Sequence, residues 1–232
     1  MAGRMIELAS DGSTARGYLV GDVGRGGPGV IVLQEWWGLV DHIKRVADRF
    51  AEAGFVALAP DLYRGESATS PDDAGRLMMA LDIERAVRDV RGAVDHLLGL
   101  DAVSSQRVAI VGFCMGGQLA LAAACADPRI GACADFYGVH PSVGLDFAQL
   151  EAPVLGLFAA NDAFVTPEVA RKLEKDLQAA GARADFHIYP DVDHAFFNDT
   201  RPEVYDADAA ADAWRRTVKF FRSELSSDAQ AR

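Results

Sequence analysis

The segment Gly112–Gly117 (GFCMGG) places a cysteine between glycines, after an apolar run and before an alanine-rich stretch. A Gly-x-nucleophile-x-Gly turn between a strand and a helix holds its central side chain above the sheet in a strained conformation. The free N–H groups and the dipole of the following helix favour a thiolate there. We therefore expect Cys114 to be a nucleophile. The other two cysteines, Cys125 and Cys133, are typical of small buried apolar residues.

A nucleophilic thiol needs a general base, and the base needs a group that orients it. In enzymes that carry the nucleophile on such a turn, the chain order is nucleophile, acid and histidine. Asp162 follows the apolar run Val154–Phe158, and His194 follows the strand-like run Phe186–Tyr189. The order therefore predicts that Cys114, Asp162 and His194 form a catalytic triad.

Five histidines compete for the role of the base. His42 and His96 fall inside predicted helices, and His187 falls inside a predicted strand. His140 ends a possible strand, which keeps it as a candidate, but it precedes the acid in the chain. His194 alone lies in a loop between the last predicted strand and the last predicted helix.

Taken alone, Asp162 is as typical of a solvated loop residue or a helix cap as of a catalytic acid. Its place in the chain order therefore carries the prediction. Two backbone N–H groups are also needed to stabilise an oxyanion. One is expected from Met115, the residue after the nucleophile. The other is expected from the loop Gln34–Gly38, which follows the apolar run Val30–Leu33.

Short apolar runs bounded by glycine, proline or charged residues recur along the chain, as in strands that are buried on both faces. Helical patterns with i+3 and i+4 spacing fall between them. This alternation predicts an α/β fold with a mostly parallel sheet and helices on both faces. The predicted strands are Val30–Leu33, Phe55–Ala59, Val108–Val111 and Val154–Phe158, with weaker patterns at Asp135–Tyr137 and Ala184–Tyr189 and an opening hairpin of Ile6–Leu8 and Tyr18–Val20.

The predicted helices have recognisable starts and ends. Asp41 caps one that stops at Gly54, and Ser70-Pro71 opens another. We find no internal repeat, linker or low-complexity tract, so we expect one domain over residues 1–232, with the polar end 226–232 frayed. The remaining helices are the repeat from Ile83 to Leu97, the alanine-rich Met115–Ala126, a segment from Thr166 to Gly181, and a last helix with the stripe Trp214, Val218, Phe221 and Leu225.

The formal net charge of −11 argues against binding to nucleic acid, which requires a basic surface. Asp191, Asp193 and His194 cluster without an HExxH or paired CxxC pattern, and Gly24–Gly27 precedes a strand, so we expect no metal or other cofactor. The odd number of cysteines indicates a reducing compartment. No apolar stretch reaches the ~18 residues of a membrane helix, and the first 25 residues contain no secretory signal pattern. We therefore expect a cytoplasmic protein with no membrane partner.

Taken together, these segments resemble the dienelactone hydrolase family over almost the whole chain. The combination of a Gln-Glu loop with the cysteine turn is specific, whereas each motif alone is less so. The resemblance implies an α/β-hydrolase fold and hydrolysis of small carboxylic esters or lactones, as by a carboxymethylenebutenolidase. It is carried by Gln34–Gly38 (QEWWG), Ala59–Tyr63 (APDLY), Val111–Gly117 (VGFCMGG), Phe136–Gly138 (FYG), Asn161-Asp162 and Asp193–Phe196 (DHAF).

The resemblance also implies roles for individual residues. Glu35 would contact the resting thiol and help to generate the thiolate when substrate binds. An acyl-enzyme would form on the cysteine and be released by water that the histidine activates. The implied set is Cys114 as nucleophile, His194 as general base, Asp162 as its partner, Glu35, and the backbone N–H groups of Trp36 and Met115 as oxyanion donors.

The chain departs from the family at the expected substrate-binding arginines. One arginine is expected shortly after the catalytic histidine, where this chain has Phe197 and Asn198. Another is expected near Pro71, where Arg64 and Arg76 are the nearest candidates. Without those cations a carboxylated lactone loses charge-assisted pairing. A neutral or differently charged ester or lactone is therefore at least as good a candidate as dienelactone itself.

Aromatic residues near the motifs predict an apolar pocket for a small-molecule substrate. Three other functions stay open: an idle relative that binds a small ligand, a thiol redox protein that uses Cys114, and a peptidase or acyltransferase on the same scaffold. The sequence does not indicate the oligomeric state. The predicted pocket residues are Trp36, Trp37, Tyr137, Phe164 and Phe196.

Overall fold

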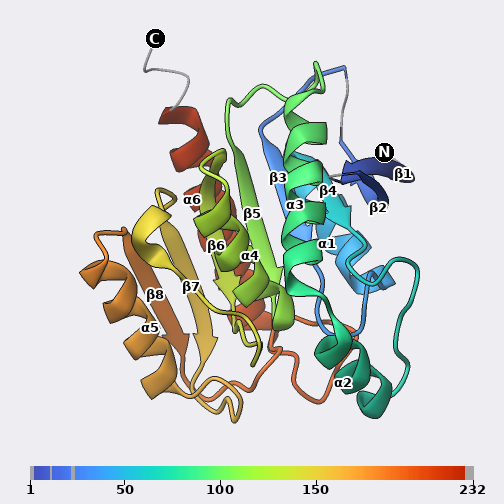
Figure 1. Cartoon of the computed structure of the whole chain (residues 1–232). Helices are drawn as coiled ribbons and strands as arrows, with labels where there is room; N and C mark the ends of the chain where they lie inside the picture. The colour runs from blue at the N-terminus through green and yellow to red at the C-terminus, as the bar shows by residue number, and fades with distance from the viewer. Residues whose placement is uncertain (1–2, 11, 22–23, 228–232) are drawn as a thin grey trace.

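The computed structural model describes residues 3–10, 12–21 and 24–227. An eight-stranded sheet with the order β1-β2-β4-β3-β5-β6-β7-β8 forms its centre (Figure 1). The six strands from β3 to β8 run parallel, as predicted. The strands are β1 (Arg4–Ser10), β2 (Ser13–Val20), β3 (Gly29–Leu33), β4 (Val56–Pro60), β5 (Val108–Phe113), β6 (Ile130–Phe136), β7 (Val154–Ala159) and β8 (Ala184–Tyr189).

The predicted opening hairpin is confirmed. β1 and β2 pair antiparallel from Arg4 with Leu19 to Ser10 with Ser13, and β2 then pairs antiparallel with β4. The hairpin therefore adds an antiparallel edge to the parallel part of the sheet.

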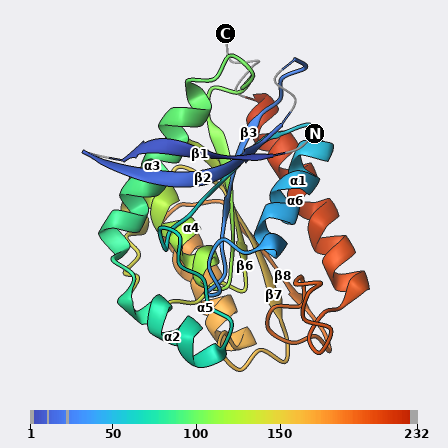
Figure 2. The ribbon, with the colours of Figure 1, turned by 90° about the vertical axis from the view of Figure 1, so that its right-hand side faces the viewer.

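Helices cover both faces of the sheet (Figure 2). α1 and α6 lie on one face, and α3, α4 and α5 lie on the other. No helix in the described ranges is long and apolar enough to cross a bilayer. The helices are α1 (Asp41–Glu52), α2 (Pro71–Ala80), α3 (Ile83–Leu98), α4 (Met115–Ala126), α5 (Pro167–Ala179) and α6 (Ala207–Ser227), with a short 3-10 turn at Phe147–Gln149.

The two helical layers explain why the central strands are continuously apolar. In β3, Val30 and Val32 pack against the layer of α1 and α6, whereas Ile31 and Leu33 pack against the opposite layer. All four side chains are fully buried. Complete burial of such a side chain contributes roughly 1.5–3 kcal/mol to the free energy of folding. Packing on both faces of β3 therefore fixes the strand, and with it the loop that follows its carboxyl end.

Several predicted boundaries differ from the structure. Asp41 is not the cap of α1 but its first residue, since Val40 occupies the cap position. Ser70 caps α2 through the N–H of Asp73, as predicted; α2 ends at Ala80, and Asp82 caps α3. β6 begins at Ile130 rather than Asp135, because the small residues before Asp135 are buried between helices. The expected fraying of 226–232 falls mostly on 228–232, which lie outside the described residues.

Candidate active site

Cys114 stands on the turn between β5 and α4, at the N-cap position of α4. Its backbone has φ 52° and ψ −121°, a strained conformation for a residue with a side chain. Its N–H donates to the carbonyl oxygen of Phe136 at 3.0 Å, and its own carbonyl accepts from Gly117 and Val139. These bonds hold the thiol, which is 8% exposed, at the start of the helix.

The turn can close only because two of its residues have no side chain. A Cβ atom on Gly112 would lie 1.8 Å from the carbonyl oxygen of Gly116. A Cβ atom on Gly116 would lie 2.4 Å from the carbonyl oxygen of Gln34. The second contact brings the loop after β3 against the start of α4, beside the thiol.

Asp162 and His194 meet at the same edge of the sheet, in the loops after β7 and β8. The imidazole Nδ1 of His194 lies 2.6 Å from Asp162 Oδ2. The other carboxylate oxygen of Asp162 accepts from the N–H groups of Phe164 at 2.7 Å and Val165 at 2.9 Å. Because these bonds fix the carboxylate, Nδ1 of His194 is the donor and Nε2 is directed away from Asp162.

The surroundings of His194 favour a charged imidazole. Burial lowers its pKa, but the interactions with Asp162 and Cys114 outweigh burial and raise the pKa to about 10. Two aromatic rings also confine the imidazole, with centroids 4.9 Å away at Tyr137 and 5.1 Å away at Phe164. At neutral pH this environment stabilises an imidazolium.

The loop after β3 lies beside the cysteine turn because β3 and β5 are neighbours. Leu33 pairs with Gly112 in the parallel ladder, so the chain leaves both strands at the same level. The loop that carries Trp36 is thereby brought beside the turn that carries Cys114 and Met115. Trp36 and Met115 are the two residues whose N–H groups the sequence predicts as oxyanion donors.

Glu35 is held by a residue far away in the sequence. Its Oε2 accepts a hydrogen bond from Asn198 Nδ2 at 2.6 Å, and both residues are 2% exposed. Its Oε1 has no hydrogen-bond partner within the described chain. Glu35 and Cys114 line the same cavity, but among the described residues the hydrogen bond of Glu35 goes to Asn198, not to the thiol.

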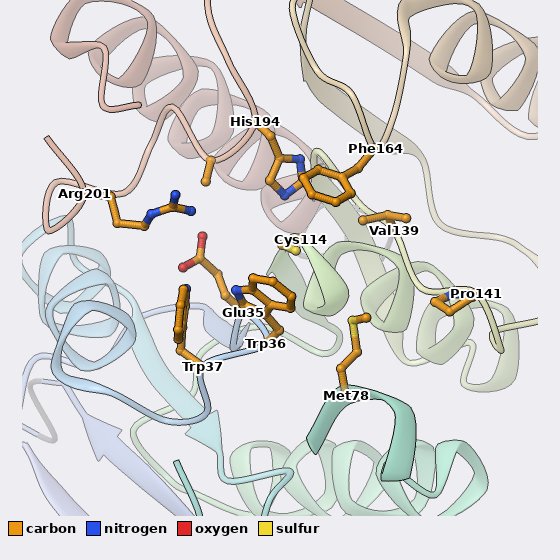
Figure 3. A pocket seen from close by; sticks show the side chains of 11 residues that line it. Glu35, Trp36, Trp37, Met78, Cys114, Val139, Pro141, Phe164, His194 and Arg201 are labelled. Carbon is orange, nitrogen blue, oxygen red and sulfur yellow. The ribbon is translucent and has the colours of Figure 1, made fainter. Parts of the chain in front are cut away.

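These groups surround a cavity of about 340 Å³ (Figure 3). Its walls are mainly apolar, and Cys114 and His194 are among the residues that line it. The size lies within the range of small-molecule sites. Of the predicted pocket residues, the lining includes Trp36, Trp37 and Phe164. The remaining lining residues are Glu35, Met78, Val139, Pro141, Ala195 and Arg201.

Four other predicted pocket residues do not line the cavity. Tyr137 and Phe196 are fully buried, and their rings lie 5.4 Å apart behind His194. Arg64 pairs with the buried Asp89 on α3 at 2.7 Å. Arg76 lies on the exposed side of α2, 3.9 Å from Asp73. Tyr137 therefore supports the imidazole, Phe196 packs against Tyr137, and neither arginine is placed to bind a substrate in the cavity.

The sequence prediction missed Arg201, the single arginine or lysine among the lining residues of the described chain. Its Nε donates to Glu203 at 2.8 Å, and its guanidinium is directed towards Glu35 and the cavity (Figure 3). The signal was present in the sequence as a basic residue in the loop between His194 and the last helix. Arg201 lies three residues beyond Asn198, outside the positions at which the family resemblance implies an arginine.

Within residues 3–10, 12–21 and 24–227, no group of three or more histidine, cysteine or acidic side chains has a metal-binding arrangement. Asp191, Asp193 and His194, which cluster in the sequence, do not form such a group. The chemistry that these residues can perform themselves is nucleophilic attack and proton transfer.

A mostly parallel sheet with a strained strand–turn–helix elbow after β5, and with Asp162 and His194 after β7 and β8, defines this chain as an α/β-hydrolase. The model of the dienelactone hydrolase family matches residues 15–225. The chain belongs to this family and is a hydrolase.

Relatives and solved structures agree with this assignment. "Protein usf" of Aquifex pyrophilus is 38% identical over 231 residues, covering 97% of this chain and 100% of the relative. The protein named "Putative carboxymethylenebutenolidase" in Aquifex aeolicus is 34% identical, covering 96% of this chain and 99% of the relative. The crystal structure of the dienelactone hydrolase-like promiscuous phosphotriesterase P91, from metagenomic libraries, has a TM-score of 0.86 and 25% identity, covering 97% of this chain and 98% of that one.

Proposed function

We propose that this protein is a cytoplasmic hydrolase that cleaves small carboxylic esters or lactones through a Cys114–His194–Asp162 triad. The observation that carries the proposal is the 2.6 Å hydrogen bond between His194 and Asp162 beside a cysteine on a strained elbow, all at one cavity. The name of the Aquifex aeolicus relative supports a lactone among the substrates. Three free cysteines support a reducing compartment.

In the first half of the reaction, the thiolate of Cys114 attacks the carbonyl carbon of the substrate. The carbonyl oxygen becomes an oxyanion, which accepts hydrogen bonds from the N–H groups of Trp36 and Met115. When the tetrahedral intermediate collapses, the imidazolium of His194 gives its proton to the departing alkoxide. An acyl-enzyme on Cys114 and a neutral imidazole remain, and a lactone substrate stays attached as one opened chain.

In the second half, the neutral imidazole takes a proton from a water molecule, which attacks the acyl carbon. The thiolate leaves, the acid is released, and His194 is again the imidazolium. Asp162 keeps the imidazole in one orientation through both halves. Glu35 generates the thiolate by accepting the thiol proton as substrate enters, and returns this proton to Cys114 after the thiolate leaves the acyl group. This role requires the Oε1 that Asn198 leaves without a hydrogen bond.

The cavity suggests what the substrate looks like. The side chains of Trp36, Trp37 and Met78 favour an apolar body, and Arg201 favours one anionic group on the side of the cavity away from Met78. A small ester or lactone with an apolar portion and a single carboxylate combines both features. Arg201 supplies the cation that the sequence lacks at positions 197 and 198.

The test is hydrolysis of p-nitrophenyl acetate beside cis- and trans-dienelactone, with Cys114→Ala, His194→Gln and Cys125→Ala. We expect no turnover with Cys114→Ala, and a ~10²–10⁴-fold loss with His194→Gln. Cys125→Ala is the matched control: burial raises the pKa of that thiol to about 11, so its loss should leave the rate unchanged. A mass increase equal to the acyl group, seen on wild type and not on Cys114→Ala, would support the acyl-enzyme.

A folded wild-type protein that cleaves none of these substrates would instead support a ligand-binding role. Full activity in Cys114→Ala would refute the proposed nucleophile. A protein that reduces peroxide in a Cys114-dependent way without cleaving any ester would support thiol redox chemistry.

A further inference from the structure

One wall of the cavity is provided by α2, a helix with few attachments to the rest of the protein. Figure 1 shows it at the edge of the fold, separate from the layer of α3, α4 and α5. Its buried side chains are Ala74 and Leu77, while Met79 is 59% exposed. Met78, in its last turn, faces the cavity (Figure 3). The position of α2 therefore determines how much room the cavity offers at this wall.

His140 makes the side-chain hydrogen bond that joins α2 to the loop after β6. Its Nε2 lies 3.2 Å from the carbonyl oxygen of Met78, and its Nδ1 lies 3.1 Å from the N–H of Ser142. The N–H of Ser142 can only donate, so Nδ1 accepts and Nε2 carries the proton that is donated to Met78. His140 is 3% exposed, and burial lowers its pKa, which keeps the imidazole in this neutral form.

The loop that carries His140 is itself fixed to the helix of the nucleophile. Gln118 on α4 accepts from the N–H of His140 at 2.6 Å and donates from Nε2 to the carbonyl of Val143 at 3.3 Å. A continuous series of hydrogen bonds thus runs from α4 through Gln118 and His140 to the carbonyl of Met78. Pro141, next to His140, lines the cavity on the same side as Met78.

We propose that His140 is a specificity-determining residue: it ties α2 to the α4 side of the cavity and so sets the size of the apolar group that the cavity admits. Both ring nitrogens are engaged with backbone groups, and His140 is not among the lining residues, so it acts through Met78 and Pro141 rather than on the substrate. Without the tether, α2 moves outward and longer acyl chains fit. This inference rests on the proposed ester hydrolysis.

The experiment compares His140→Phe, Gln118→Met and wild type on p-nitrophenyl esters from acetate to octanoate. Phenylalanine keeps the bulk of the ring but makes neither hydrogen bond. Gln118→Met removes the bonds of Gln118 to the loop and leaves the side chain of His140 in place. We expect kcat/KM for octanoate relative to acetate to rise about tenfold in both variants, with kcat for acetate unchanged. His187→Phe, on the edge strand β8, is the matched control and should keep the wild-type ratio.

Hydrogen exchange provides a readout that does not depend on catalysis. The amides of α2 should exchange faster in His140→Phe than in wild type, while those of α3 stay unchanged. Unchanged exchange in α2 would refute the tether. Faster exchange with an unchanged ester ratio would refute the specificity role. Failure of the wild-type protein to cleave any ester would refute the proposed hydrolysis, and with it the specificity, whatever the exchange of α2 shows.

Discussion

Asn198 donates a hydrogen bond to Glu35 across 2.6 Å, although the two residues are 163 positions apart in the sequence. The amide cannot turn around, because its Oδ1 already accepts from the N–H of Thr200 at 3.0 Å and from the hydroxyl of Thr200 at 2.6 Å. Glu35 is thus oriented by a neutral donor.

The first prediction concerns this pair. Asn198→Ala should slow the alkylation of Cys114 by iodoacetamide and lower kcat about tenfold, because Glu35 loses its orientation. In a Glu35→Gln background, the same substitution should cost almost nothing, since its effect passes through the carboxylate. Equal costs in the two backgrounds would show that Asn198 acts elsewhere. Asn198→Asp replaces the donor with a second carboxyl group beside Glu35. The two carboxyl groups should then share a proton, and the acid limb of the rate profile should move to higher pH.

The second prediction is a pH dependence of stability that arises from His194. The folded protein raises the pKa of this imidazole to about 10, so the imidazole binds its proton more tightly in the folded state than in the unfolded state. Its stabilising contribution is fully present below the unfolded pKa of about 6.5 and is lost as pH rises through about 10. The difference in unfolding free energy between wild type and His194→Gln should therefore be largest below pH 6.5 and shrink towards pH 10. A constant difference over that range, measured by urea unfolding, would contradict the charged resting imidazole.

The third prediction concerns the elbow. Gly112→Ala places a Cβ atom 1.8 Å from the carbonyl oxygen of Gly116, where only backbone movement can relieve the contact. We expect a loss of at least about 1–3 kcal/mol in the free energy of unfolding, together with loss of Cys114 reactivity. Gly75→Ala in α2 is a matched control, because nothing lies within 4 Å of its added Cβ. That variant should be neutral or more stable by about 0.4–1 kcal/mol in thermal or urea unfolding.

The features that the sequence predicted well are local. The turn around Cys114 is encoded by adjacent glycines, an apolar strand before them and an alanine-rich helix after them, so its geometry follows from neighbours in the chain. Asp162 and His194 could be located because parallel strands deliver their following loops to one edge of the sheet. The structure brings both residues to that edge, 2.6 Å apart.

The features that the sequence could not predict depend on contacts between distant segments. Asn198 drew attention only as an uncharged residue at the place of an expected arginine, and nothing in its neighbourhood reveals the hydrogen bond to Glu35. Tyr137 and Phe196 are aromatic residues of the kind that line pockets, yet both are buried outside the cavity lining. The direction of a side chain depends on the local backbone, which the sequence pattern does not give. Tyr137, with φ 43°, illustrates this point. Arg64 was near the expected position in the chain but is paired with Asp89.

The last prediction tests Arg201 as the anion-binding group of the cavity. Its guanidinium is directed towards the cavity, and no other arginine or lysine is among the lining residues of the described ranges. Arg201→Gln should raise KM for an ester with a terminal carboxylate, such as a p-nitrophenyl hemisuccinate, by about tenfold or more, since a hydrogen bond to a charged group contributes roughly 1.5–3 kcal/mol. The neutral p-nitrophenyl butyrate should keep its KM, because its apolar chain needs no cation. Arg171→Gln, on the exposed surface of α5, is the control for the loss of one positive charge. Parallel losses for both esters would mean that Arg201 supports the loop rather than the substrate, whereas a loss confined to the hemisuccinate would establish an anionic substrate group beside the apolar wall.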